Sequence, residues 1–229
     1  MGASSSTARA MEELAPILKD DMVLISLQNG LGNYEIMKQA FPTGTIAYGV
    51  TSMGASLQER TVVFGGAGSV LVGSTDESIL PPLMELFEKS SIEAAIVQNP
   101  DEALWTKAIV NSAVNPLGAL LGVPNGALIK NKDLAALQGD IIAEAVRAAR
   151  ATGILLSEEL LKETTRTICG KTATNLCSML QDISAGRTTE IEEITGKIIE
   201  AGQEGGLSME VNQTLFRLIK AREALNREG

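Results

Sequence analysis

The segment LWTKAIVNSAVNPLGALLGVPNGAL, residues 104–128, decides the fold of the second half of this chain. It is apolar except for Lys107, Asn111 and Asn115, which follow one another at intervals of four residues. At about 100° per residue, such positions stay within roughly 80° of one another on a helix, so they form one polar stripe. A helix that is apolar on its other faces lies in a core, where polar groups are paired or perform chemistry. The segment therefore predicts a buried helix with one functional face.

A proline interrupts this helix pattern. Pro116 has no N–H to donate to the Ser112 carbonyl, and it disfavours helical geometry at the preceding Asn115. We therefore expect the helix to kink or stop there. A further amide, Asn125, follows at a turn before the next helix start.

From residue 101 to the C-terminus the sequence shows helical periodicity only. No stretch in this half alternates in the way a strand does. The second half, residues 100–229, is therefore expected to be all-α. The expected helices cover residues 101–115, 117–122, 126–131, 133–152, 157–183, 189–204 and 210–227.

Residues 1–99 alternate between helix and strand patterns, which is typical of an α/β domain. The stretch MVLISLQ, residues 22–28, predicts a fully buried strand, and Asn33 is expected to cap the helix that follows. The strands expected over 45–57, 61–66 and 69–74 suggest an inserted antiparallel meander. The other expected elements are helices at 6–20, 33–41 and 77–90 and a strand at 94–98.

Composition excludes several classes of function. The net charge of −9 is carried by scattered residues, which argues against nucleic acid as a partner. No apolar run is long enough for a membrane span, so we expect a cytoplasmic protein without membrane association. Histidine is absent, which excludes Ser-His-Asp catalysis and histidine metal sites. Cys169 and Cys177, placed on one expected helix, match no zinc pattern and predict buried free thiols; no metal site is expected.

A second polar group lies in TNLCSMLQDISAGRTTEIEEITG, residues 174–196. Asn175 and Ser178 are three residues apart and would share one helix face. Thr189 with Glu192 predicts a capping box for the next helix, which places Glu190 in its first turn. The alternative for Glu190 is a solvated carboxylate favoured by the helix dipole.

A third polar group lies in SLQNGLGN, residues 26–33, where a strand ends in Asn29 and leads into a helix. Ligands gather at the carboxyl ends of strands in α/β proteins, although such a turn also needs Asn and Gly for its geometry alone. The stretch FGGAGS, residues 64–69, lies between two strands and predicts a hairpin. A dinucleotide fingerprint needs a strand before and a helix after, and the chain contains no G-x-G-x-x-G.

Together these three stretches resemble the ketopantoate reductase (2-dehydropantoate 2-reductase) family, over residues 8 to 225. The resemblance implies an α/β plus all-α fold. A partial Rossmann-like NAD(P)-binding domain would occupy residues 1–99, without its first strands and glycine-rich loop. A helical substrate and catalytic domain, similar to the C-terminal domain of 6-phosphogluconate dehydrogenase, would occupy residues 100–229.

The resemblance also implies roles for individual residues. Lys107 matches the lysine that donates a proton to the substrate oxygen, and Glu190 matches the glutamate that contacts the cofactor and helps to fix that lysine. Asn29 and Gly66 match cofactor-contacting positions. The implied substrate-binding residues are Asn111, Asn115, Asn125 and Ser178, to which we add Asn175 from the same expected helix face.

The implied activity is the NADPH-dependent reduction of 2-dehydropantoate (ketopantoate) to pantoate in pantothenate biosynthesis, catalysed by an oxidoreductase. The apolar character of the helical half favours a homodimer. Hydride addition to a ketone builds negative charge on oxygen, so a proton-donating cation lowers the barrier. Two alternatives remain open: a reductase of another small 2-keto acid, and an inactive truncated helical module for dimerisation or folding. The choice between NADPH and NADH is open as well, because the ribose-discriminating segment belongs to the missing part.

Overall fold

A computed structural model describes residues 6–58, 61–66 and 68–228. Their contacts divide the chain into two compact units. The first extends to Gln28 and continues over Gly32–Leu104, and the second comprises Asn29–Leu31 and the chain from Trp105 onward. The described residues include no helix with the length and apolar character that crossing a membrane requires.

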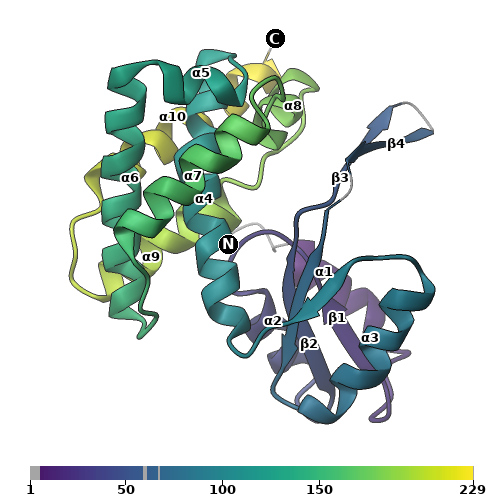
Figure 1. Ribbon diagram of the computed structural model, residues 1–229. Helices are drawn as coiled ribbons and strands as arrows, with labels where there is room; N and C mark the ends of the chain where they lie inside the picture. The colour runs from purple at the N-terminus through teal and green to yellow at the C-terminus, as the bar shows by residue number, and fades with distance from the viewer. Residues whose placement is uncertain (1–5, 59–60, 67, 229) are drawn as a thin grey trace. The chain divides into compact units, whose positions relative to one another are not determined.

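The first unit holds a mixed sheet with the strand order β1-β2-β5-β6. In this sheet β1 and β2 are parallel, β2 and β5 are antiparallel, and β5 and β6 are parallel. The strands β3 and β4 form a separate antiparallel ribbon that extends beyond the sheet (Figure 1). The elements are α1 Ser6–Leu14, β1 Val23–Ser26, α2 Asn33–Ala40, β2 Thr45–Thr51, β3 Gly54–Gln58, β4 Thr61–Gly66, β5 Val70–Ser74, a 3₁₀ turn Glu77–Ile79, α3 Leu80–Lys89 and β6 Ala94–Ile96.

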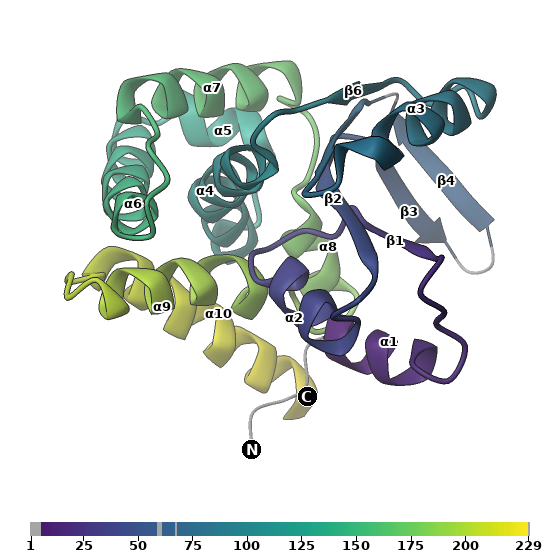
Figure 2. The same ribbon diagram turned by 90° about the horizontal axis from the view of Figure 1, so that it is seen from below.

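Helices cover both faces of this sheet. Ile46 and Ala47 are neighbours on β2, so their side chains point to opposite faces. One cluster contains Ile46, Met11, Met37 and Phe41, from β2, α1 and α2. The other contains Ala47, Val70, Val72, Leu83 and Phe87, from β2, β5 and α3. Figure 2 accordingly shows α1 and α2 on one side of the sheet and α3 on the other, which is α/β layering as predicted.

Three local predictions for this unit are wrong. β1 is not fully buried: Val23 and Ile25 are 41% and 42% exposed, since β1 is the edge strand and pairs only with β2 among the described strands. Asn33 does not cap α2, because Gly32 takes the capping position and Asn33 Oδ1 accepts a 2.5 Å hydrogen bond from Thr7 Oγ1. Residues 64–69 do not link a hairpin, because β4 pairs with β3 and not, among the described strands, with β5; residue 67 of this stretch lies outside the described residues.

Among the described residues of the second unit every secondary-structure element is a helix, as predicted. In Figure 1 the long helix α4 runs through the other helices of this unit. Side-chain caps define two of the starts: Asn131 accepts from two backbone N–H groups of α6, and Ser157 accepts from one of α7. The elements are α4 Pro100–Leu121, α5 Asn125–Lys130, α6 Lys132–Ala151, α7 Glu158–Lys171, α8 Ser178–Ser184, a π-helical turn Glu192–Gly196, α9 Lys197–Glu204 and α10 Glu210–Glu228.

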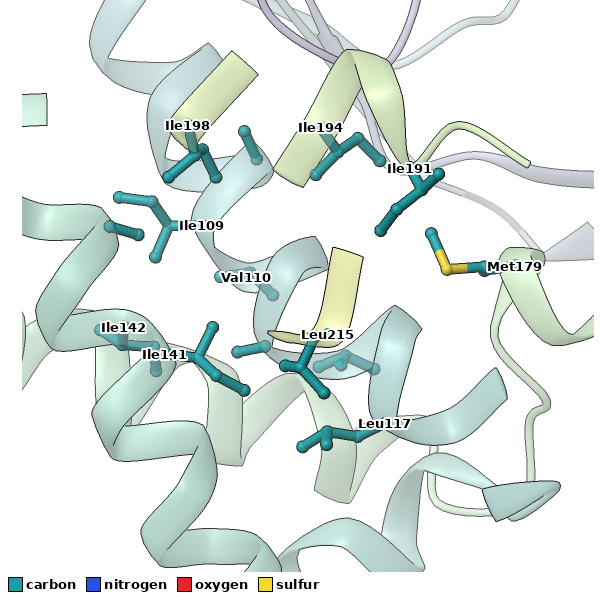
Figure 3. Packing of buried hydrophobic residues seen from close by; sticks show 14 of the residues in the cluster. Ile109, Val110, Leu117, Ile141, Ile142, Met179, Ile191, Ile194, Ile198 and Leu215 are labelled. Atoms are coloured by element: carbon teal, nitrogen blue, oxygen red, sulfur yellow. The ribbon is translucent and has the colours of Figure 1, made fainter. Parts of the chain in front are cut away.

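The core of the second unit is built around the apolar faces of α4. Figure 3 shows Ile109, Val110 and Leu117 of this helix among isoleucines and leucines of the neighbouring helices. Burying one such side chain contributes about 1.5–3 kcal/mol. The labelled partners are Ile141, Ile142, Met179, Ile191, Ile194, Ile198 and Leu215.

The structure corrects two helix boundaries here. α4 does not stop at Pro116 but continues to Leu121. An internal proline costs about 3 kcal/mol, and the burial of several large side chains on both sides of it outweighs that cost. The expected helix over 157–183 is broken between α7 and α8, so Cys169 and Cys177 are not on one helix. Both are nevertheless buried and free, as predicted.

Candidate active site

The polar stripe lies on α4, as the four-residue spacing predicts. Lys107 and Asn111 are half-buried, and Asn115 is buried with 5% exposure. A rise of about 1.5 Å per residue separates Lys107 from Asn115 by roughly 12 Å along the helix axis. The stripe thus has a charged end at Lys107 and an amide end at Asn115. The two ends lie near different segments of the second unit.

At the charged end, Lys107 and Glu190 influence each other electrostatically. Burial lowers the pKa of Lys107, and the negative charge of Glu190 opposes this in part. Burial raises the pKa of Glu190, against which the Asn29 hydrogen bond and the charge of Lys107 act. A carboxylate that is harder to ionise beside an ammonium that loses its proton more easily is a pair suited to proton transfer.

Asn29 completes this end. Its Nδ2 donates a hydrogen bond of 2.9 Å to Glu190 Oε2, across 161 residues of sequence. Although Asn29 follows β1 in the chain, its contacts place Asn29–Leu31 in the second unit. The structure therefore brings together Lys107, Asn29 and Glu190, which the sequence had supplied from three separate stretches.

The amide end is organised by the loop between α7 and α8. Asn125 donates its backbone N–H to the Asn175 carbonyl at 3.0 Å, and its Nδ2 to Thr172 Oγ1 at 2.9 Å. Asn125 Oδ1 is buried and has no hydrogen-bond partner among the described residues. An orphaned buried acceptor is rare in proteins, and it fits a ligand that carries a hydroxyl or amide donor.

Asn175 and Ser178 do not share a helix face. Asn175 lies exposed in the loop, and Ser178 is the exposed first residue of α8. The sulfur of the preceding residue, Cys177, donates to the Asn115 carbonyl at 3.5 Å, so the start of α8 lies against α4 beside Asn115. The loop between the helices thereby brings Asn175 to Asn125 and Ser178 toward Asn115.

Gly66 belongs to the first unit, where it is the last residue of β4 and pairs with Gly54. A hollow of about 720 Å³ on the second unit is lined by residues of α4, α8 and α10, but by none of the predicted site residues. Among the described residues there is no group of three His, Cys, Asp or Glu side chains that could hold a metal ion.

Sequence reasoning missed the support behind Glu190. The predicted capping box is wrong, because the Thr189 N–H and Oγ1 both donate to Glu223 Oε1, each at 2.7 Å. Glu223 is 3% exposed, and its other oxygen lies 3.2 Å from Lys220 Nζ. A glutamate within the apolar stripe of the last helix was the available signal, since such a side chain needs buried partners.

A mixed α/β unit followed by an all-helical unit with a half-buried lysine–glutamate pair defines a two-part protein with a candidate acid–base site. Residues 4–77 match the family Ketopantoate reductase PanE/ApbA, and residues 99–223 match Ketopantoate reductase PanE/ApbA C terminal. The chain belongs to the ketopantoate reductase family of oxidoreductases, and the predicted resemblance is confirmed.

Individual relatives agree with this assignment. The 2-dehydropantoate 2-reductase of Pyrococcus horikoshii is 37% identical over 229 residues, which cover 97% of this chain and 74% of the relative. The complex of D-mandelate dehydrogenase with NADH has a TM-score of 0.91 at 25% identity, covering 95% of this chain and 75% of that one. A dimeric ketopantoate reductase from Staphylococcus aureus has a TM-score of 0.81 at 22% identity, again covering 95% of this chain and 75% of that one.

Proposed function

We propose that this protein reduces 2-dehydropantoate to pantoate with NADPH, as a step of pantothenate biosynthesis, and that Lys107 is the general acid. The observation that supports this most directly is the cluster of Lys107, Glu190 and Asn29. Its three members come from distant stretches of sequence. The hydrogen bond from Asn29 to Glu190 and the mutual charge effects of Lys107 and Glu190 join them. The relative from P. horikoshii carries the name of this activity.

Lys107 has the properties of a proton donor to a developing alkoxide. Negative charge grows on the keto oxygen during reduction, and an ammonium beside it both stabilises that charge and supplies the proton. Burial lowers the pKa of Lys107, which makes the proton easier to release at neutral pH. Glu190 opposes this shift and keeps the lysine charged until the substrate needs the proton.

The amide end of the stripe would hold the rest of the substrate. The buried Asn125 Oδ1, which has no partner among the described residues, would accept a hydrogen bond from the substrate hydroxyl. A hydroxylated 2-keto acid offers one hydroxyl, one keto oxygen and one carboxylate, and amide and hydroxyl side chains can bind all three. The residues proposed for this role are Asn111, Asn115, Asn125, Asn175 and Ser178.

The residues beside Lys107 also fit a nicotinamide cofactor. The carboxamide of nicotinamide has a donor and an acceptor, and an amide next to a carboxylate can match both. Asn29 and Glu190 form such a neighbouring pair. When bound, NADPH supplies the hydride. We propose Asn29 and Glu190 as cofactor contacts, with the Gly66 backbone as a further one.

The same proposal covers domain organisation, assembly and location. The cofactor domain would comprise residues 1–99 and the catalytic domain residues 100–229. A homodimer is supported by the dimeric S. aureus neighbour and by Leu218 and Leu225, which are 48% and 64% exposed and seven residues apart on α10. A cytoplasmic location is supported by the acidic composition, with a net charge of −9 and charged residues scattered along the sequence.

One observation favours a second candidate within the same chemistry. D-mandelate dehydrogenase shares the fold closely, and its complex contains NADH. Mandelate is a 2-hydroxy acid with an aromatic side chain, so this fold accommodates other side chains and the other nicotinamide cofactor. A reductase of another small 2-keto acid is therefore the alternative, and an inactive helical module is the non-enzymatic one.

The test is the oxidation of NADPH, and separately of NADH, by the purified protein with 2-dehydropantoate and a panel of other 2-keto acids. The chain is assayed by itself and together with any coding sequence that precedes Met1 in its gene. The highest kcat/KM for 2-dehydropantoate with NADPH is expected. A tenfold preference for another keto acid would establish the alternative substrate. No oxidation in either form, with normal folding, would support the inactive module.

A further inference from the structure

The turn that follows Glu190 is widened into a π-helix, and this changes which backbone groups pair. Gly196 N–H donates to the Ile191 carbonyl at 2.9 Å, five residues back rather than four. Lys197 N–H is shared between the Glu192 and Ile194 carbonyls and does not donate to that of Glu193, as an α-helix requires. Single π turns of this kind occur frequently at functional sites.

The Glu193 carbonyl, which lacks its α-helical donor, accepts a hydrogen bond from a distant residue. Leu31 N–H donates to Glu193 O at 2.9 Å, 162 residues away in the sequence. This bond fixes the three-residue segment Asn29–Leu31 to the π turn within the second unit. The change from α-helical to π-helical pairing therefore leaves the Glu193 carbonyl available to accept the hydrogen bond from the Asn29–Leu31 segment.

The middle residue of the segment must be glycine for this contact to form. A Cβ atom added at Gly30 would lie 2.6 Å from Glu193 O and 2.7 Å from Glu193 Cβ, closer than real Cβ atoms come. Gly30 also has a φ of +90°, which side-chain-bearing residues rarely adopt. Any other residue at this position would push the segment away from the π turn.

The segment matters because of its first residue. Asn29 Nδ2 donates to Glu190 Oε2 at 2.9 Å, so the place of the segment sets the place of this donor. Burial is the main cause that raises the pKa of the Glu190 carboxylate, and the charges of Asp182 on α8 and Glu193 on the π turn raise it further. The Asn29 hydrogen bond and the charge of Lys107 on α4 lower it. Removing Asn29 from this set would leave two neighbouring carboxylates opposed by Lys107 alone.

We propose that the π turn and Gly30 are a positioning device that seats Asn29–Leu31 and so fixes Asn29 on Glu190. Gly30 is a positioning residue, because it acts through Asn29 and not on the substrate. The importance of this device for turnover rests on the proposed reductase function. Its structural part, the seating of Asn29 on Glu190, is independent of that function.

The chain contains a matched control for the test. Gly153 has the same φ of +90°, but a Cβ added there would meet nothing within 4 Å. Gly30→Ala and Gly153→Ala therefore share the backbone strain, and only Gly30→Ala introduces the clash. Asn29→Ala is the third variant, which removes the donor and leaves the seat intact.

Three measurements are made on each full-length variant: thermal unfolding, hydrogen exchange of the Leu31 amide, and titration of the Glu190 carboxyl by carbon-13 NMR. Gly30→Ala should speed Leu31 exchange by about tenfold or more, the loss of one hydrogen bond, and raise the pKa of Glu190. Asn29→Ala should raise that pKa with the Leu31 amide still protected. Gly153→Ala should change neither.

The proposal is overturned if Gly30→Ala leaves both readouts as in the parent protein, or if Gly153→Ala shifts them equally. If Gly30→Ala does not fold, the Asn29→Ala variant tests the proposal instead. An unchanged pKa of Glu190 in Asn29→Ala would refute the role of Asn29 at that carboxylate. In a form that oxidises NADPH, Gly30→Ala should lower kcat by about tenfold. If the parent protein does not oxidise NADPH, the proposed function is refuted. The hydrogen exchange of Leu31 and the titration of Glu190 would still test the positioning of Asn29.

Discussion

Two carboxylates in the helical unit, Glu190 and Glu223, are treated differently by the fold. Glu223 accepts two hydrogen bonds of 2.7 Å from Thr189 and lies 3.2 Å from the ammonium of Lys220. Burial opposes its ionisation, but these partners outweigh burial, so the pKa of Glu223 is lowered. The Glu190 carboxylate accepts a hydrogen bond from Asn29, but burial dominates, so its pKa is raised.

The number of hydrogen-bond donors around a carboxylate is a criterion for separating one that stabilises the fold from one that could serve a function. A third buried glutamate, Glu144, follows the first pattern: it accepts from the N–H groups of Val211 and Asn212 and from Asn212 Nδ2 at the start of α10. Buried charges that only hold the fold are supplied with donors. Glu190, with fewer donors and a half-buried lysine nearby, retains capacity for a ligand.

The largest expected effect tests whether the region around Glu190 is catalytic at all. Lys107→Ala should lower turnover of 2-dehydropantoate by about 10²–10⁴, the usual contribution of a general acid. The measurement is steady-state NADPH oxidation, in whichever form of the chain turns over. Lys130→Ala, an exposed lysine at the end of α5, should leave the rate unchanged. A loss under threefold for Lys107→Ala would remove this lysine from the mechanism.

The next effect tests the structural role of Glu223. Glu223→Gln should cost about 2–3 kcal/mol, because Thr189 and Lys220 lose a charged buried partner. For a chain of this size that is a fall in Tm of about 4–12 °C. Glu204→Gln, an exposed glutamate at the end of α9, is the control and should change Tm little. An equal Tm for both variants would contradict the comparison.

The pH dependence of the same variant has a fixed sign. Because the folded pKa of Glu223 lies below its ordinary value of 4.5, its ionised form stabilises the fold above pH 4.5. That stability is lost as the pH falls through the folded pKa. The difference in Tm between the parent and Glu223→Gln should therefore be full at neutral pH and shrink in acid.

A smaller effect is expected at the other end of the same hydrogen bonds. Thr189→Val keeps the shape of the side chain but removes the hydroxyl donor to Glu223, at a cost of about 1 kcal/mol. Thr189→Ser keeps the donor and should restore most of the lost stability. Chemical denaturation of both variants measures this. Equal stabilities for Val and Ser would show that the hydroxyl bond to Glu223 contributes nothing.

The smallest effect should have the opposite sign. Glu190→Gln removes a charge that burial disfavours but keeps an acceptor for Asn29, so stability at neutral pH should rise by about 0.5–2 kcal/mol. The folded pKa of Glu190 lies above its ordinary value of 4.5, so stability is lost as the pH rises from 4.5 through the folded pKa. The gain should thus be absent below pH 4.5. A loss of stability at neutral pH would place Glu190 with Glu223 as a structural carboxylate.

The sequence predicted the α/β and all-α halves, and it singled out Asn29, Lys107 and Glu190, which the structure brings together. The spacing of Lys107, Asn111 and Asn115 on one helix face needed no structure, because helix periodicity alone decides it. Two helix boundaries were predicted wrongly, because helix propensity is local and does not include the free energy of burial in the folded protein. α4 continues through Pro116, and the helix expected over 157–183 is divided into α7 and α8.

The sequence by itself determined the helical character of the second unit and the polar stripe of Lys107, Asn111 and Asn115 on its first long helix. Only the tertiary structure decided that Asn29 meets Glu190, that the Asn125 and Asn175 stretches lie together, and that Glu223 holds Thr189. Periodicity follows from chain geometry within one element, and it is therefore written in the sequence. Hydrogen bonds across 34 to 162 residues depend on packing between elements, and one residue of register in a π turn is enough to make or lose such a bond.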